Sequence, residues 1–189
     1  VQNYAKSSIT GVLRKDDRVL FILDMEKILA ALDPSLDMSH VEVDTTPVED
    51  AGKFHLLVVD DSSAIRHIIR SSLVQSGFQV TDKGTGMDAW NYLQQLRDEC
   101  AGRGERLTDH LHVIISDIEM PEMDGHSLTA HIRSDPAMRD IPVILFSSLI
   151  TDAVRVKGEK VGADRQVSKP DLPRLNQIIR ELIAAKLHR

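Results

Sequence analysis

The sequence is poor in cysteine and in aromatic residues: it has one cysteine, Cys100, and Phe, Trp and Tyr together make up 4% of it. A single cysteine excludes an internal disulfide framework and argues against a cysteine-built metal site. No uninterrupted apolar run reaches the roughly 20 residues that a membrane-spanning helix needs, and no secretory signal pattern opens the sequence. We therefore predict a cytoplasmic protein without direct membrane insertion.

A basic stripe is also missing, and the charge is unevenly distributed. The net charge is −6, from 23 Lys and Arg against 29 Asp and Glu. Residues 33–52 hold six of the acids, two prolines and no Lys or Arg. Such a composition is typical of an extended, self-repelling linker. Because the remainder is close to neutral, we expect no nucleic-acid partner.

The segment after this acidic linker, residues 53–189, alternates strand-like and helix-like patterns five times. Short β-branched runs predict strands at 54–59, 78–80, 113–115, 142–146 and 165–167. Helical spacing predicts helices at 63–75, 87–100, 126–133, 152–161 and 172–187. Five consecutive β–α units predict an α/β fold with a doubly wound, five-stranded parallel sheet.

The segment before the linker, residues 1–32, reads as strand, turn, strand and short helix. The runs SSITGVLR and RVLFILD flank a turn-like Lys15-Asp16-Asp17, and EKILAAL has helical character. About 30 residues cannot bury an independent core. We therefore expect residues 1–32 to be the C-terminal part of a larger, truncated domain.

Ionisable and hydroxyl side chains stand where four of the predicted strands end. Asp60-Asp61 follows the first strand, Asp117 the third, Ser147 the fourth and Lys169 the fifth. Taken singly, each has a structural explanation, such as Asp61 or Ser62 capping the next helix or Lys169 in a solvated turn. Together they fall at the same ends of successive parallel strands, where doubly wound sheets bind ligands.

These side chains match the chemistry of phosphoryl transfer to a carboxylate. Three crowded carboxylates repel one another, and a bound hard cation would relieve this repulsion. Mg²⁺ is such a cation and prefers oxygen ligands. A carboxylate can attack phosphorus and form an acyl phosphate. An ammonium and a hydroxyl can then neutralise and hydrogen-bond the phosphoryl oxygens.

The segment from residue 54 onward resembles bacterial receiver domains of the CheY-like superfamily. The resemblance rests on four stretches: LLVVDDS (56–62), IISDIEMPEMDG (114–125), PVILFSS (142–148) and SKP (168–170). It implies that Asp117 is the phosphoacceptor, and that Ser147 and Lys169 contact the phosphoryl group. It also implies that Asp60, Asp61, Asp117 and the backbone carbonyl of Glu119 hold Mg²⁺.

Two features depart from the receiver pattern. Receivers often carry Tyr or Phe three residues before the strand-five lysine, and this chain has Gln166 there. In the family that aromatic side chain swings inward on activation. Its absence here leaves open how phosphorylation would change the surface that partners bind. The region 97–111 is also longer than a minimal receiver loop, and we interpret it as a solvated extension. We expect no metal partner for His110 and His112, which lie beside a strand.

The stretch ITGVLRKDDRVLFILDMEKIL resembles the final hairpin and helix of CheW-type coupling domains. A CheW-like part followed by a receiver is the order found in CheV-type chemotaxis coupling proteins. That resemblance implies two partners, a chemotaxis-type histidine kinase and the signalling domain of a chemoreceptor.

Three functions follow as hypotheses. The first is a non-enzymatic coupling adaptor that is tuned by self-catalysed phosphorylation and dephosphorylation at Asp117. The second is a phosphate sink or stand-alone response-regulator receiver, which Gln166 keeps open. The third is a haloacid-dehalogenase-like phosphatase, which also uses an aspartyl phosphate. Chain order argues against the third, because that family has its nucleophile on the first strand and its acidic pair last.

Overall fold

The computed structural model describes residues 9–15, 18–23, 50–148, 150–169 and 174–187, and the chain divides into two units, 1–42 and 43–189. In the first unit, β1 (Ile9–Lys15) pairs antiparallel with β2 (Arg18–Leu23), and Val12 lies opposite Phe21. The two predicted strands are confirmed by this pairing, and the turn predicted between them falls on residues 16–17, outside the described residues. The helix expected near residues 26–32 lies outside the described residues.

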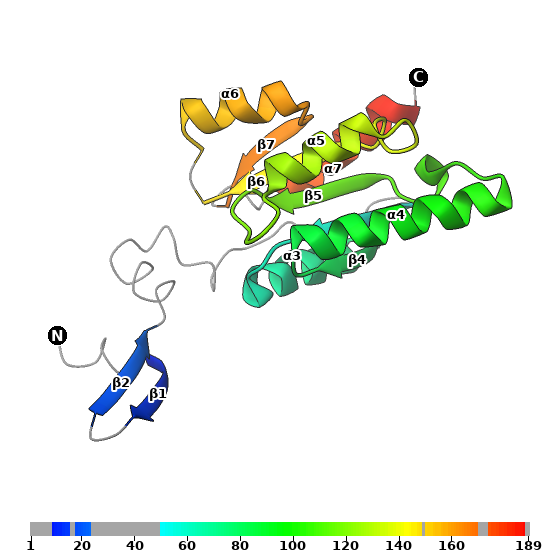
Figure 1. Cartoon of the computed structure of the whole chain (residues 1–189). Helices are drawn as coiled ribbons and strands as arrows, with labels where there is room; N and C mark the ends of the chain where they lie inside the picture. The colour runs from blue at the N-terminus through cyan, green and yellow to red at the C-terminus, as the bar shows by residue number, and fades with distance from the viewer. Residues whose placement is uncertain (1–8, 16–17, 24–49, 149, 170–173, 188–189) are drawn as a thin grey trace. The chain divides into compact units, whose positions relative to one another are not determined.

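The second unit contains a five-stranded parallel sheet in the order β4-β3-β5-β6-β7. Its strands are β3 (His55–Val59), β4 (Gln79–Lys83), β5 (Val113–Asp117), β6 (Val143–Ser147) and β7 (Arg165–Ser168). Figure 1 shows these strands side by side between the helices. The prediction of a doubly wound α/β fold is confirmed. The chain runs from β3 to β4 on one side and then returns to β5 on the other side of β3, so the direction of winding reverses there.

Five helices alternate with these strands. They are α3 (Ser63–Gln75), α4 (Gly86–Arg103), α5 (Gly125–Ser134), α6 (Asp152–Val161) and α7 (Leu175–Leu187). The bounds predicted for α3 and α6 were correct. The hydroxyl of Ser62 accepts a hydrogen bond from the Ile65 amide, so Ser62 is the residue that caps α3. Helix α4 continues past the predicted end at Cys100 and is capped by Gly104 in the left-handed conformation.

The central strands are buried on both faces, as their continuous apolar runs predict. On one face, sheet residues such as Leu57, Ile114 and Leu145 form a core with side chains of α4 and α5, and partly buried side chains of α6 pack against it. Helix α7 contacts β5, and α3 contacts β3 and β4. The amide of Asn176 in α7 donates to the hydroxyl of Ser76 at the end of α3, at 2.7 Å. The sheet therefore lies between two helical layers.

The last residues assigned to the linker from the sequence belong to the second unit. Ala51 begins a short 3-10 helix, η3 (Ala51–Lys53), and its side chain is buried. The side-chain amide of Gln79 donates to the carbonyl of Gly52 at 2.6 Å. The first turn of this unit thus starts a few residues before the predicted boundary at 53.

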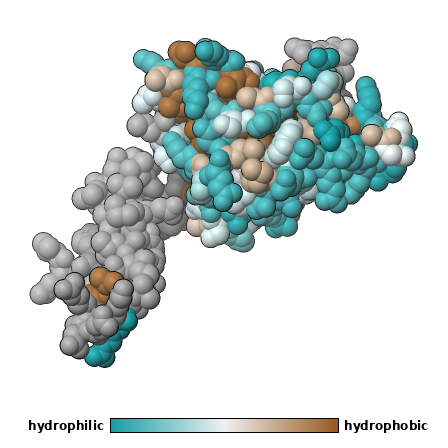
Figure 2. Space-filling view, viewed as in Figure 1, coloured by the Kyte–Doolittle hydropathy of each residue, from teal (hydrophilic) through white to brown (hydrophobic). Residues whose placement is uncertain are grey.

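The surface of the second unit is mostly hydrophilic in the view of Figure 2, with hydrophobic atoms gathered over α6. That helix carries Val156, whose side chain is 62% exposed. Among the described residues, no helix combines the length and the apolar character needed to cross a membrane.

Candidate phosphoacceptor site

The fold brings four of the predicted site residues to the carboxyl edge of the parallel sheet. Asp60 follows β3 directly, Asp117 and Ser147 are the last residues of β5 and β6, and Lys169 follows β7. The Nζ atom of Lys169 lies 3.4 Å from an oxygen of Asp60 and 3.4 Å from an oxygen of Asp117. Both carboxylates are almost fully buried, at 1% and 2% exposed. A single ammonium therefore balances two buried acids.

Burial dominates the protonation of this group. It raises the pKa of Asp117 to about 7, with Lys169 opposing the shift and the carboxylates of Asp60 and Glu119 adding to it. Burial also raises the pKa of Asp60, against the opposing effects of Lys169 and the Ser62 amide. Burial on its own would lower the pKa of Lys169, but the two carboxylates outweigh it and raise that pKa. Asp117 is thus held close to its titration midpoint at neutral pH.

Ser147 is positioned differently from the other predicted residues. Its hydroxyl donates a 3.0 Å hydrogen bond to a carboxylate oxygen of Glu119, in the loop after β5. Glu119 was predicted to take part through its backbone carbonyl, and the contact of its side chain with Ser147 was not foreseen. The hydrogen bond joins the loop after β5 to the end of β6, beside Asp117.

The loop after Asp117 approaches the acceptor so closely that only glycine fits at position 125. A Cβ atom built on Gly125 would lie 2.2 Å from the Asp117 carbonyl oxygen. The Gly125 amide donates to the carbonyl of Ile118 at 3.0 Å, which closes the loop, and Asp124 caps the helix that follows. Gly86 is equally constrained, since its Cβ would lie 2.2 Å from the Met123 carbonyl oxygen. Glycines in two helices therefore set the position of this loop.

Arg66 is a second residue that the sequence did not single out. Its Nη1 atom donates to the carbonyl of Asp60 at 2.6 Å, and its Nε atom donates to Asp82 at 3.1 Å. The amide of Ser62 donates to Asp60 Oδ1 at 2.8 Å. These hydrogen bonds fix the acidic turn after β3 through both the backbone carbonyl and the side chain of Asp60.

The three carboxylates are suited to a hard cation. One oxygen from each of Asp60, Asp61 and Asp117 lies within 4.8 Å of the others. Asp60 Oδ2 and Asp117 Oδ1 are buried without a hydrogen-bond partner among the described residues. Their 3.4 Å distances to Lys169 are longer than the roughly 2.7–2.9 Å of a tight charge-assisted bond. The buried oxygens and the all-oxygen donor set therefore fit Mg²⁺.

Gln166, at the position where receivers often have an aromatic residue, packs against α6. Its Nε2 atom donates to the carbonyl of Arg155 at 2.8 Å. A Cβ atom on Gly158 would lie 2.4 Å from the Gln166 side chain, so the glycine leaves space for the amide. The side chain is thus held by one turn of α6 in the structure.

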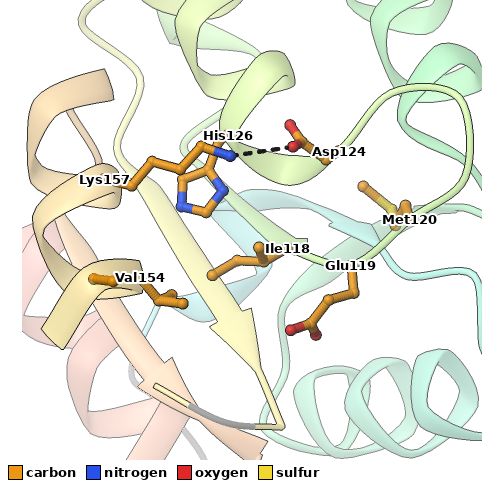
Figure 3. Close-up of a pocket in the computed structure, with 8 residues that line it drawn as sticks. Ile118, Glu119, Met120, Asp124, His126, Val154 and Lys157 are labelled. Carbon is orange, nitrogen blue, oxygen red and sulfur yellow. Dashed lines mark hydrogen bonds and ion pairs between the residues drawn. The ribbon is translucent and has the colours of Figure 1, made fainter. Parts of the chain in front are cut away.

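A cavity of about 350 Å³ lies beside the acceptor loop, between that loop, α5 and α6. Figure 3 shows Lys157 reaching from α6 toward Asp124, with the ring of His126 next to them. Lys157 Nζ and Asp124 Oδ2 are 3.4 Å apart. The cavity is lined mainly by apolar atoms, including those of Ile118 and Val154. It adjoins the site, because Glu119 takes part in both.

Comparisons with known proteins agree with this geometry. The chain is 33% identical over 179 residues to the chemotaxis protein CheV3 of Helicobacter pylori, which covers 94% of this chain and 56% of that protein. It therefore spans only a little over half the length of this relative. It is 32% identical to the chemotaxis protein CheY1 of Helicobacter pylori, covering 70% of this chain and 95% of that protein.

A solved structure gives the same result for the fold. The signal receiver domain of a signal transduction histidine kinase from Syntrophus aciditrophicus matches with a TM-score of 0.59 and 28% identity. The match covers 70% of this chain and 91% of that one. Residues 56–180, well over half of the sequence, match the response regulator receiver domain family. The chain therefore belongs to the family of response regulator receiver domains.

Proposed function

We propose that this chain is a chemotaxis signalling adaptor whose receiver unit is phosphorylated on Asp117 by a histidine kinase. The observation that carries the proposal is the grouping of two buried acids, Asp60 and Asp117, around the Lys169 ammonium at 3.4 Å. Buried charges of this kind are costly to maintain and are concentrated at functional sites. Their place at the carboxyl edge of a doubly wound sheet points to ligand chemistry.

In the proposed reaction, a carboxylate oxygen of Asp117 forms a bond to phosphorus while the phosphorus–nitrogen bond of a phosphohistidine donor breaks. The product is an acyl phosphate, which water later hydrolyses back to the carboxylate. Lys169 would neutralise charge on the phosphoryl oxygens, and Ser147 would hydrogen-bond one of them after leaving Glu119. The roles of both residues are therefore electrostatic and orienting.

Asp60, Asp61, Asp117 and the backbone carbonyl of Glu119 would hold Mg²⁺ in this proposal. Bound there, the ion would supply positive charge to the phosphoryl oxygens. In the free chain, Lys169 partly serves this purpose for the two buried carboxylates. We expect the ion to favour the ionised form of Asp117, the form that can attack phosphorus.

The adaptor role rests on residues 1–32 and on the similarity to CheV3, which extends across 94% of the chain. We propose that this segment belongs to a CheW-like part that binds the signalling domain of a chemoreceptor. The acidic stretch 33–52 would tether the receiver to it and raise the effective concentration of one for the other. Phosphorylation would then alter receptor–kinase coupling by a local change of charge.

A phosphate sink is the second candidate function, and Gln166 favours it. The side-chain amide of Gln166 donates to the Arg155 carbonyl. Because this side chain is not aromatic, it cannot signal phosphorylation by the inward burial of an aromatic ring. A switch requires partner affinity to change on phosphorylation, whereas a sink requires only turnover of the phosphoryl group. Measuring both the lifetime of the phosphoryl group and the affinity for a receptor–kinase complex separates the two.

We propose no turnover of an external substrate by this chain, and in particular no haloacid-dehalogenase-like phosphatase activity. The acidic pair directly follows β3, the first strand of the parallel sheet along the chain, and the lone acceptor ends β5, the third, which is opposite to the order in that family. The match to receiver domains over residues 56–180 supports the same conclusion.

Intact-mass spectrometry tests the central proposal. The chain is incubated with Mg²⁺ and a small acyl-phosphate donor, beside Asp117→Asn and Asp88→Asn variants. Asp88 is a matched control because it is an exposed aspartate in the first turn of α4. We expect one phosphoryl group on the parent and on the Asp88 variant, removable by hydroxylamine, and none on the Asp117 variant.

Two outcomes would contradict the proposal. A phosphoryl group on the Asp117→Asn variant would place the acceptor elsewhere. No adduct on the parent, with Mg²⁺ binding established by titration, would mean that the receiver unit is degenerate. Any function would then have to come from the segment before it.

A further inference from the structure

At the far end of α4 from the acceptor loop, the chain folds back sharply on itself. The helix ends at Arg103, and Gly104 has a φ of 71°. The amide of Glu105 donates to the Cys100 carbonyl at 2.9 Å, which returns Glu105 toward the last helical turn. A short 3-10 helix, η4 (Leu107–Asp109), follows, and the amide of His110 donates to the Leu107 carbonyl at 2.9 Å. In Figure 1 this segment lies at the opposite end of β5 from its arrowhead.

This turn brings three metal-ligating side chains together. One ligand atom from each of Cys100, Glu105 and His110 lies within 4.8 Å of the others. The Nε2 atom of His110 and the Oε2 atom of Glu105 are 2.8 Å apart. The cysteine is buried, at 1% exposed, whereas the side chains of Glu105 and His110 are 42% and 38% exposed. The cluster therefore has a sulfur at its base and nitrogen and oxygen ligands facing solvent.

We propose that Cys100, Glu105 and His110 form a binding site for Zn²⁺ or a similar transition-metal ion. Thiolate, imidazole and carboxylate are the three side-chain ligands that zinc uses, and a site with three of them leaves one position for water. Mg²⁺, by contrast, prefers oxygen ligands alone. The second unit would thus carry two sites of different metal preference, one of oxygen atoms at the carboxyl edge of the sheet and one of sulfur, nitrogen and oxygen at the end of α4.

Binding requires a proton balance that can be measured. The Cys100 thiol must lose its proton to solvent as the sulfur–metal bond forms, and the imidazole must bind in its neutral form. Affinity should therefore fall as the pH is lowered, while the ion keeps its oxidation state. No redox partner is needed.

Arg103 currently occupies the space beside the cluster. Its Nη2 atom is 3.9 Å from the Cys100 sulfur, and its Nε atom donates to Glu105 at 2.9 Å. The guanidinium is a positive charge in contact with two of the three ligands, so it competes with a metal ion. Its side chain is 52% exposed, so it can turn into solvent without leaving a buried gap. Removing it should tighten metal binding.

A bound ion would join the end of α4 to the segment that leads into β5. This connection was interpreted from the sequence as a solvated extension, and His110 as a residue without a metal partner. That expectation missed Glu105 and Cys100, which the left-handed turn at Gly104 brings to the imidazole. The ion would hold the extension in one conformation and raise the thermal stability of the unit.

Absorption spectroscopy with Co²⁺ gives the sharpest test, because a thiolate–cobalt bond produces a strong near-ultraviolet band that oxygen ligands do not. The untagged full chain is titrated with Co²⁺, and Zn²⁺ affinity is then measured by displacement of Co²⁺. We expect one equivalent to give the band. Glu105→Gln and His110→Ala should each weaken Zn²⁺ binding by at least about tenfold, and Arg103→Ala should strengthen it.

Control variants separate this site from the acceptor site. Asp117→Asn should leave the cobalt–thiolate band intact, and so should Glu99→Gln, which changes an exposed acid one residue before Cys100. Cys100→Ser should abolish the band; because this residue is buried, the exposed His110 and Glu105 variants test the site even if Cys100→Ser does not fold. No thiolate band at stoichiometric Co²⁺, or equal Zn²⁺ affinity in the parent and the His110 and Glu105 variants, would overturn the proposal.

Discussion

The two ends of the parallel sheet in the second unit are organised in opposite ways. At the carboxyl edge, the charged groups Asp60 and Asp117 are buried, and the loop after Asp117 touches backbone so closely that Gly125 has no room for a Cβ atom. At the other end, around the end of α4, ion pairs such as Arg106–Asp109 are exposed, and Gly102 has no atom within 4 Å of a built Cβ. Close tertiary packing thus marks the edge of the proposed phosphoacceptor, while Gly102 at the other end has room for a side chain.

Gly125→Ala should produce the largest effect. The new methyl group would meet the Asp117 carbonyl oxygen at 2.2 Å, so the backbone of the loop must move. We expect the free energy of unfolding to fall by about 3 kcal/mol, the upper range for overpacking a rigid site. Urea denaturation monitored by circular dichroism measures this. A loss of unfolding free energy below about 1 kcal/mol would mean that the loop after Asp117 can shift to accommodate a Cβ atom at little cost.

Asp117→Asn should increase stability, and by an amount that depends on pH. Burial raises the pKa of Asp117 to about 7 in the folded chain, from an ordinary value of 3.8. The folded state therefore binds more protons than the unfolded state between these values, so its stability falls as the pH rises through them. Asparagine does not ionise, so the stability of the variant does not fall with pH for this reason. We expect the variant to gain about 2 kcal/mol relative to the parent between pH 4 and pH 8.

Denaturation at several pH values, with a chelator present to remove divalent ions, measures this difference. The pH dependence of groups that do not interact with Asp117 cancels when the two proteins are compared, whereas Lys169, Asp60 and Glu119 interact with it and contribute to the difference. Adding Mg²⁺ at pH 8 should stabilise the parent more than the variant, because the ion favours the ionised carboxylate. A stability difference that stays constant from pH 4 to pH 8 would show that Asp117 is not held in a costly ionised state.

Gly158→Ala should have a smaller effect that depends on Gln166. The new Cβ would lie 2.4 Å from the Gln166 side chain and push its amide away from the Arg155 carbonyl. Alanine improves helix propensity by about 1 kcal/mol, which partly offsets the lost hydrogen bond. We expect Gly158→Ala to be slightly destabilising alone and stabilising in a Gln166→Ala background.

A double-mutant cycle on these two positions should give a coupling energy of about 1 kcal/mol. Unfolding free energies of the parent, the two single variants and the double variant supply it. A coupling near zero would mean that the Gln166 side chain moves away from Gly158 without loss of stability.

Gly102→Ala should have the smallest effect, and it should be favourable. The residue lies in the last turn of α4, is exposed, and has open space around the position of a Cβ. Replacing a helical glycine by alanine reduces the entropy of the unfolded chain. We expect a gain of about 0.5 kcal/mol in the free energy of unfolding, measured beside Gly125→Ala. A loss would show that the end of α4 is also constrained by tertiary contacts.

Much of the fold was predictable because its signals are local. The apolar runs of β3, β5 and β6 and the helical spacing of α3 and α6 each appear within a short window of sequence. The order of five β–α units then placed Asp60, Asp117, Ser147 and Lys169 at one edge, because parallel strands all end on the same side. The predicted grouping is present in the structure, although the chemical roles of these residues stay predictions.

Other features could not be predicted because they depend on where distant segments meet. The hydrogen bond from Ser147 to Glu119 joins loops after two different strands. Arg66 reaches the Asp60 carbonyl from the following helix, and nothing in its local sequence distinguishes it from the other arginines of the chain. The end of α4 was placed too early for a related reason, since Gly102 can continue a helix and Gly104 takes the left-handed conformation that ends it.

By itself, the sequence determined the α/β class, the strand order along the chain and the edge of the sheet that carries the acids. These follow from hydrophobic periodicity and from the direction of parallel strands, which need no knowledge of packing. Only the tertiary structure decided that Lys169 lies between Asp60 and Asp117, and that Cys100, Glu105 and His110 meet. Both groupings depend on the direction in which the chain turns after a strand or helix, and that direction is set by long-range contacts and by backbone geometry at single residues such as Gly104.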